Sequence, residues 1–306
     1  MLFRMPAVFF CIITLLFFLP GASFAKTEYI FFFSLTGYDR AHKFGKLSSF
    51  DVYNNEIYIS DSQQKTIAIF DIEGNLLSRF GKERNLGGRP EQLIVAHDKI
   101  FIRISLKRNI EIFNILGRKV GEITPPYKEF DAGLMAATED GIAIFDKKTK
   151  KMCFFNQSGK LLSNFSLKDK IRTVAGFTYN NKKVYISSMD RSRALSIFTK
   201  NGKFIKGIGQ VGNSSSQFAV PAGVVVDKDG IIWVVDAFKQ RAVGYYQDGK
   251  KHSSITGQWT HMGSFNYPEL VRFGGGLIFV METGTNNISV LKKEQSPQKE
   301  TNFDPF

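Results

Sequence analysis

The chain repeats one pattern six times: an apolar alternating segment, a short polar loop, a second apolar segment and a turn that in most copies contains glycine. Alternation with many β-branched and aromatic residues is typical of strands rather than helices. The first apolar segments start at Ile57, Ile100, Ile142, Val184, Ile232 and Ile278, so that successive copies lie 42 to 48 residues apart. A period of this length restricts the fold to architectures that are assembled from similar units.

Each repeat accounts for four strands. The two apolar segments give two strands, a third follows the glycine turn in five of the six units, and a short strand precedes each unit, as in PAGVVVDKDG from Pro221. The turn glycines are Gly74, Gly117, Gly159, Gly202 and Gly249. Four strands in a repeat of this length correspond to a propeller blade. We therefore predict an all-β fold, a six-bladed β-propeller of four-stranded blades.

The two ends of the repeat region complement each other. The sixth unit has no final strand, whereas the N-terminal region contains a strand without a unit, YIFFFSLTG from Tyr29. Its ending, SLTG, resembles SITG at the end of the fifth unit. Because an incomplete last blade would expose unpaired strand edges, we predict that the N-terminal strand completes this blade and closes the ring. The predicted propeller spans 26–292, and the polar segment 293–306 is predicted to be a disordered tail.

Residues 1–25 have the features of a secretory signal peptide. Arg4 precedes an uncharged apolar run over 7–19, and small residues stand before Lys26, where cleavage is expected. The apolar run is short for a membrane span, so no transmembrane span is expected after cleavage. We predict an exported protein, either periplasmic or secreted, with an uncleaved anchor as the alternative.

The fifth unit, PAGVVVDKDGIIWVVDAFKQRAVGYYQDG, resembles an NHL repeat, the unit of many six-bladed propellers. The marker positions of that family correspond here to Pro221, Gly223, Asp236, Arg241 and Gly249, and in the first unit to Asp61 and Gly74. The resemblance implies a structural role for Asp236 and Arg241, which would brace the loop between blade strands. Other units depart from the family pattern, with Ile104 and Ser188 where the Asp is expected. NHL propellers include binding modules and enzymes, so the resemblance does not identify an activity.

Basic residues gather in the loops between the second and third strands of the units. In a propeller, these loops share one face with the connections between blades. They contain Lys65, Lys107, Arg108, Lys147, Lys148, Lys150, Lys151, Arg191, Arg193, Lys239 and Arg241, with Asp190 as the one acid. Such an excess of positive charge attracts anionic partners. The alternative is that these loops are charged for solubility, because turns on the other face also carry lysines.

Three connections between blades are longer than the others, and the third is rich in aromatic residues. They begin at Gly81, Gly209 and Gly257, and the third contains Trp259, His261, Phe265 and Tyr267. Flat aromatic faces can hold a sugar ring or a protein side chain. Alternatively, Trp259 and Phe265 fill the gap between the last two blades.

The mouth of the central channel is predicted to carry three carboxylates. The residues expected next to the innermost strands are Ser49, Glu91, Asp131, Arg172, Ala222 and Glu269. Oxygen ligands around an axis can bind a hard cation. However, Arg172 stands among them and no Asp-rich calcium loop occurs, so we predict a solvated channel without a metal.

The sequence contains none of the common catalytic or cofactor motifs. HExxH, CxxC, CxxCH and GxSxG are all missing, although zinc, haem or hydrolase sites require such groupings. The four histidines are expected at different levels of the propeller. Signal cleavage would leave Cys153 as the one cysteine, and its apolar strand predicts a buried thiol.

These observations favour a non-catalytic binding or scaffold module that uses its loop face to bind a protein or an anionic component of the cell envelope. We expect a monomer without a cofactor. The formal charge of +13 and the pI of about 9.6 would also suit nucleic acid, but export and the scarcity of aromatic residues among the loop cations argue against it. The alternative function is a hydrolase or lyase that uses Glu91, Asp131 and Glu269 as acid and base.

Overall fold

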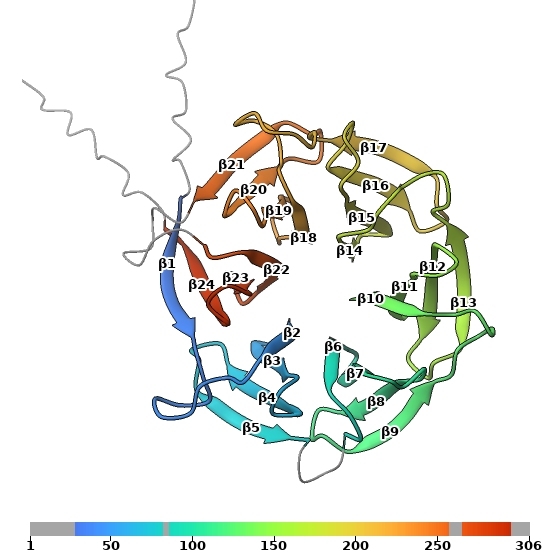
Figure 1. Ribbon diagram of the computed structural model, residues 1–306, viewed down its shortest axis with the longest axis vertical. Helices are drawn as coiled ribbons and strands as arrows, with labels where there is room; N and C mark the ends of the chain where they lie inside the picture. The colour runs from blue at the N-terminus through green and yellow to red at the C-terminus, as the bar shows by residue number, and fades with distance from the viewer. Residues whose placement is uncertain (1–27, 82–85, 257–264, 295–306) are drawn as a thin grey trace, which may run out of the picture.

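In the computed structural model, six four-stranded antiparallel sheets surround a central axis (Figure 1). The structure describes residues 28–81, 86–256 and 265–294. The predicted signal, Trp259, His261 and most of the predicted tail lie outside these ranges. Within them, no helix is long and apolar enough to cross a membrane. The six-bladed propeller of four-stranded blades is therefore confirmed.

The first strand of each blade lies next to the axis and the fourth lies at the outer edge (Figure 1). Blade one consists of β2 (Leu47–Tyr53), β3 (Glu56–Asp61), β4 (Thr66–Asp71) and β5 (Leu76–Phe80). Blade two consists of β6 (Pro90–Ala96), β7 (Lys99–Ile104), β8 (Ile110–Asn114) and β9 (Lys119–Ile123). Blade three consists of β10 (Ala132–Ala137), β11 (Gly141–Asp146), β12 (Lys151–Asn156) and β13 (Leu161–Ser166). Blades four and five consist of β14 (Gly176–Asn180), β15 (Lys183–Ser187), β16 (Leu195–Thr199) and β17 (Phe204–Ile208); and β18 (Pro221–Val226), β19 (Ile232–Asp236), β20 (Arg241–Tyr245) and β21 (Lys251–Thr256).

The sixth blade joins the two ends of the chain. It consists of β22 (Pro268–Gly274), β23 (Leu277–Glu282), β24 (Asn287–Glu294) and, as its outermost strand, β1 (Glu28–Leu35). β1 pairs antiparallel with β24 from Tyr29 opposite Lys293 to Leu35 opposite Ile288. The predicted closure of the ring by the N-terminal strand is thus confirmed.

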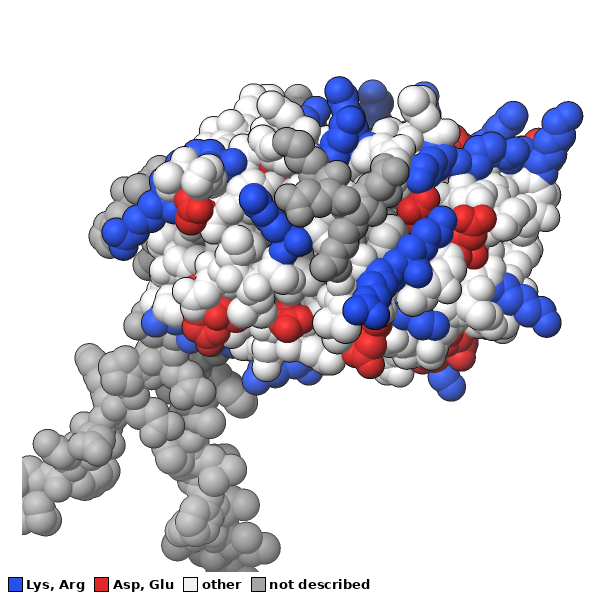
Figure 2. Space-filling model, turned by 90° about the horizontal axis from the view of Figure 1, so that it is seen from below, with Lys and Arg blue, Asp and Glu red and all other residues white. Residues whose placement is uncertain are grey.

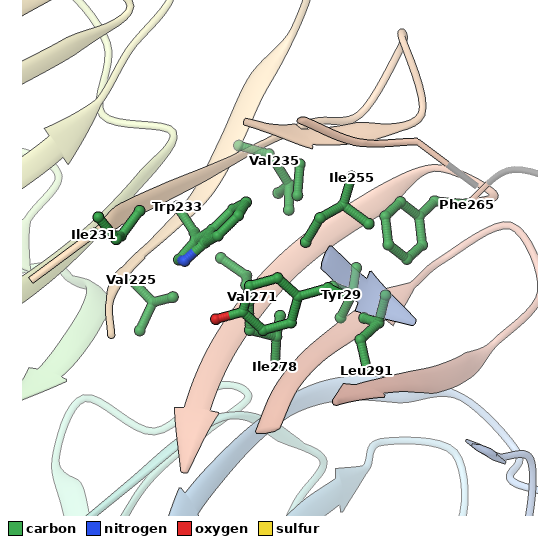
Figure 3. Packing of buried hydrophobic residues seen from close by; sticks show 13 residues of the cluster. Tyr29, Val225, Ile231, Trp233, Val235, Ile255, Phe265, Val271, Ile278 and Leu291 are labelled. Atoms are coloured by element: carbon green, nitrogen blue, oxygen red, sulfur yellow. The ribbon is translucent and has the colours of Figure 1, made fainter. Parts of the chain in front are cut away.

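Tyr29 fastens the closing strand to the preceding blade. Its ring packs edge-on against the Trp233 ring at 5.2 Å between centroids, and Figure 3 shows it pointing from β1 into a cluster with Trp233 and Val271. Asp227 accepts hydrogen bonds from Trp233 Nε1 at 2.9 Å and from the Tyr29 hydroxyl at 3.4 Å. β1 therefore contributes core contacts as well as strand pairing.

The core is divided among the junctions between neighbouring blades. Each of the six junctions encloses one cluster of buried apolar side chains among the described residues. The turn before the outermost strand lies against the preceding blade, as Gly202 does. Its φ is +79° and a Cβ there would lie 2.5 Å from the Phe165 ring, so both backbone conformation and contact require glycine.

A β-bulge interrupts the outermost strand of every blade at the same position. The unpaired residues are Phe32, Leu77, Val120, Leu162, Ile205 and His252. A bulge twists an edge strand away from the flat geometry that would pair with another chain. The repeat therefore protects each outer edge in the same way.

Buried carboxylates at the end of the second strand hold the incoming connection in four blades. Asp236 is fully buried and accepts hydrogen bonds from the backbone of Ala219 and Val220 at 2.9 and 3.0 Å. Arg241 lies 3.9 Å from the same carboxylate and donates to the carbonyls of Ser215 and Gln217. The equivalent acids in the other three blades are Asp61, Asp146 and Glu282. The structural role predicted for Asp236 and Arg241 is confirmed.

Cys153 is fully buried in β12, as predicted, and burial raises the pKa of its thiol to about 11. Because the thiolate is the reactive form, and two pKa units correspond to a roughly hundredfold smaller thiolate fraction, we expect negligible reaction with Ellman's reagent at pH 8 in the native protein. Protein that begins at Lys26 and is unfolded in guanidinium should react at once. Fast labelling of the native protein would contradict the buried position.

Candidate functional site

One face of the ring carries all the loops in which the sequence analysis placed partner binding, and we call it the loop face. It comprises the loops 62–65, 105–109, 147–150, 188–194, 237–240 and 283–286, together with the described parts of the connections 36–46, 81–89, 124–131, 167–175, 209–220 and 257–267. The turns that join the first strand of a blade to the second, and the third strand to the fourth, lie on the opposite face. This arrangement follows from the antiparallel order of each blade.

Several loop-face cations hold neighbouring connections in place. Lys239 donates to the carbonyls of Ser214 and Gln217 at 2.6 and 2.7 Å. Arg108 donates to the Lys128 carbonyl at 2.6 Å. Backbone carbonyls in irregular connections need donors, and these side chains supply them. Such residues are needed for the scaffold whether or not they also bind a partner.

Other predicted partner-binding cations are tied in similar ways. Lys107 pairs with Glu111 at 2.5 Å and donates to the Leu86 carbonyl, and Arg193 donates to the Lys170 carbonyl. Lys147 lies 3.3 Å from Asp131. Lys150 and Lys151 lie over aromatic rings, those of Phe145 and Tyr127.

Lys148 and Arg191 differ from these cations. Both are exposed, and neither side chain has a hydrogen-bond or ion-pair partner among the described residues. Within the same residues, cations outnumber carboxylates on the loop face because the connections add Arg40, Lys43, Lys46, Arg89, Lys128, Lys168, Lys170 and Arg172 against Asp39, Glu129, Asp131 and Asp169. In the side view of Figure 2, basic side chains stand along the upper edge of the molecule, and most acidic side chains lie below it.

A cavity of about 470 Å³ opens on the loop face between blades two and three. It brings together five residues that the sequence analysis selected separately, namely Glu91, Lys107, Arg108, Asp131 and Lys148. The other lining residues are Arg103, Ile104, Leu106, Lys128, Glu129, Phe130 and Ala132. Pockets of several hundred Å³ are the usual size of small-ligand sites. The loop face therefore contains a defined cavity and not only dispersed charge.

Blade two departs from the repeat at this cavity. Strand pairing places Arg103 at the position that Ser60, Phe145, Ser187, Val235 and Met281 occupy in the other blades. Arg103 forms an ion pair with Glu91, and its Nε is buried without a hydrogen-bond partner in the structure. The next residue, Ile104, replaces the bracing acid. The scaffold does not require these polar groups, so they are candidates for a function.

The carboxylates predicted at the channel mouth do not form one ring. Glu91 and Glu269 occupy equivalent positions, each after the proline that begins its strand, whereas Asp131 precedes β10 and Arg172 lies within the connection 167–175. Among the described residues, no three His, Cys, Asp or Glu side chains are grouped to bind a metal. The channel wall desolvates Glu269 and raises its pKa, an effect that the Lys46 charge partly offsets.

The aromatic connection before β22 is described from Phe265 onward. Phe265 is buried in the cluster between blades five and six (Figure 3), which confirms that it fills this gap. Tyr267 is half exposed at the surface. The sequence analysis did not select Arg103, Lys128 or Glu129, although an arginine inside the apolar strand IFIRI was a visible signal.

Comparisons with known proteins support the architecture. Residues 168–269 match DUF5128, a family described as a 6-bladed beta-propeller. No curated protein sequence matches the chain. A structural genomics protein of unknown function from Bacteroides thetaiotaomicron is similar with a TM-score of 0.68 and 16% identity, over 88% of this chain and 76% of that one.

Two enzyme structures are also similar. Virginiamycin B lyase from Staphylococcus aureus has a TM-score of 0.58 and 13% identity, over 90% of this chain and 89% of its own. Hydrazine synthase from Kuenenia stuttgartiensis has a TM-score of 0.57 and 11% identity, over 82% and 84%. Identities this low carry the fold and not the function. The chain is thus a six-bladed β-propeller, similar in fold to both enzymes and proteins of unknown function.

Proposed function

We propose that this propeller is an exported, non-catalytic binding module whose loop face holds an anionic polymer of the cell envelope or an acidic protein surface. The observation that carries the proposal is the cavity between blades two and three. Lys107, Arg108 and Lys148 line it together with Arg103, whose position the repeat does not need to make polar. The surrounding excess of cations would attract an anionic partner over a longer range.

The location and oligomeric state belong to the same proposal. Export, to the periplasm or out of the cell, rests on the signal-like segment 1–25. An exported protein meets anionic polysaccharides and lipids more readily than nucleic acid. We propose a monomer without a cofactor, because the bulges protect the outer edges of all six blades.

Catalysis by the predicted carboxylates has less support. Glu91 and Asp131 both line the cavity, but Glu91 is paired with Arg103 and Asp131 with Lys147. Glu269 does not line it. An acid and a base must reach one substrate from suitable positions. The structure does not bring the three predicted carboxylates to one site, and the two that share the cavity are each paired with a cation.

Retention on immobilised heparin tests the loop face. We expect binding that weakens steeply with ionic strength. Changing Lys147, Lys148, Lys150 and Lys151 to Gln should weaken it roughly tenfold or more, since each exposed charge contributes some tenths of a kcal/mol. The matched control changes Lys160, Lys203, Lys250 and Lys251 to Gln in hairpin turns of the opposite face. Equal losses in both variants would show that only net charge matters.

A further inference from the structure

The cavity between blades two and three presents charges of both signs to a ligand. Its cations are Arg103, Lys107, Arg108, Lys128 and Lys148, and its carboxylates are Glu91, Glu129 and Asp131. Lys128, Glu129 and Lys148 are exposed, and the side chains of Glu129 and Lys148 have no partner among the described residues. These two residues are therefore available for a ligand without breaking an internal contact.

The mixture of groups limits the chemistry of that ligand. A carboxylate only accepts hydrogen bonds, whereas Lys and Arg only donate them, and a hydroxyl group does both. A ligand with several hydroxyls can therefore satisfy the two kinds of side chain together. The excess of cations over carboxylates leaves positive charge for one anionic group. We infer that the cavity binds an acidic sugar, a sugar ring that carries a carboxylate, and this inference rests on the function proposed above.

Other anions fit the lining less well. Inorganic phosphate would be attracted by the cations, but the three carboxylates repel it. It also has few hydrogen-bond donors to offer them. A lipid chain would need an apolar wall, whereas Ile104, Phe130 and Ala132 are buried in the protein and Leu106 alone of the apolar lining residues is exposed. A hydroxylated ligand can use both the donors and the acceptors of the lining.

Leu106 forms the apolar lip of the cavity. Its side chain is fully exposed and its φ is +65°, a backbone conformation that is unfavourable for a residue with a Cβ. Strained, exposed residues are often found at binding sites. The leucine can cover the C–H face of a sugar ring whose hydroxyls point to the charged side chains, which gives this otherwise costly residue a role.

The test is calorimetric titration of the protein with galacturonate, which carries one carboxylate, and with its neutral methyl ester. We expect binding of the acid, and at least tenfold weaker binding of the ester, because the ester loses charge-assisted hydrogen bonds. Lys148→Gln should weaken binding of the acid by roughly tenfold. Lys160→Gln removes the same charge from the opposite face and should leave binding unchanged.

Glu129→Gln separates an acidic-sugar site from a simple anion site. If Glu129 accepts a sugar hydroxyl, the substitution weakens galacturonate binding, whereas at a simple anion site the loss of a repelling carboxylate strengthens it. Stronger binding in this variant, or no binding of galacturonate to the wild type, would overturn the inference. The proposed function would still stand in that case if retention on heparin depends on the loop face. If the protein is retained on no anionic matrix, the proposed function itself is rejected.

Discussion

A chain without β1 is expected not to form a stable monomer. Removing residues 1–35 leaves β24 as an unpaired edge and takes Tyr29 and Leu35 out of two different core clusters. Each large buried side chain contributes roughly 1.5–3 kcal/mol, and with the lost strand pairing the deficit is comparable to the roughly 5–15 kcal/mol that stabilises a typical domain. Thermal unfolding followed by circular dichroism, with size-exclusion chromatography, should show a non-cooperative or aggregated species.

Two further samples decide whether the missing strand is the cause. Removing residues 295–306 instead should leave the unfolding midpoint within a few degrees of the full chain, because the deletion begins beyond the end of β24. A peptide of residues 26–37, added to the shortened chain, should restore cooperative unfolding by completing the sixth blade. A shortened chain that unfolds cooperatively by itself would show that five complete blades and an open sixth are sufficient.

The architecture was predictable because its determinants are local in sequence. The period of 42 to 48 residues and the glycine turns recur in most units, so one well-matched copy such as Pro221–Gly249 allows the weaker copies to be identified. Closure by β1 followed from an excess strand at one end and a missing strand at the other. The bracing role of Asp236 and Arg241 was implied by the NHL resemblance and is seen in the contacts.

The site was less predictable because it depends on contacts between units. The sequence placed Lys239, Arg108 and Arg193 in loops, but it did not show which carbonyls they reach in the neighbouring connections. It therefore treated bracing cations and unpartnered ones alike. The cavity joins loop 105–109 with connection 124–131, and only the packing of two blades creates it.

Register explains the difference at the channel mouth. The sequence analysis placed one residue next to each innermost strand, whereas the structure begins β6 and β22 one residue before Glu91 and Glu269 and begins β10 one residue after Asp131. Glu91 and Glu269 therefore align, and Asp131 and Arg172 do not. Short connections of variable length carry no local signal for such shifts.

An ion pair that the sequence analysis missed joins three innermost strands. Asp51 of β2 lies 3.0 Å from Arg272 Nε of β22, 221 residues away in the chain, and accepts a hydrogen bond from the Val95 backbone of β6 at 2.8 Å. Both charged side chains are largely buried. Burial raises the pKa of Asp51, and the Arg272 charge acts against that rise. The pair therefore links blades six, one and two around the axis.

Asp51→Ala is expected to reduce the free energy of unfolding by about 3–5 kcal/mol, because it leaves a buried guanidinium without its counter-charge. It also leaves the Val95 amide without an acceptor. Replacing both partners, as in Asp51→Leu with Arg272→Met, should restore much of the loss, since removing both charges also removes their desolvation cost. Urea denaturation of Asp51→Leu, of Arg272→Met and of the double variant measures the coupling between the two positions, and Asp51→Ala is measured alongside them.

The size of that coupling distinguishes two roles for the pair. If the double variant is nearly as stable as the wild type and still elutes as a monomer, the ion pair adds little net stability and serves mainly to fix how the three strands meet. If the losses simply add, the two side chains stabilise the ring independently, through the Val95 hydrogen bond and through the packing of Arg272 over the Phe50 ring. We expect the first outcome, because buried charges cost most when only one of them remains.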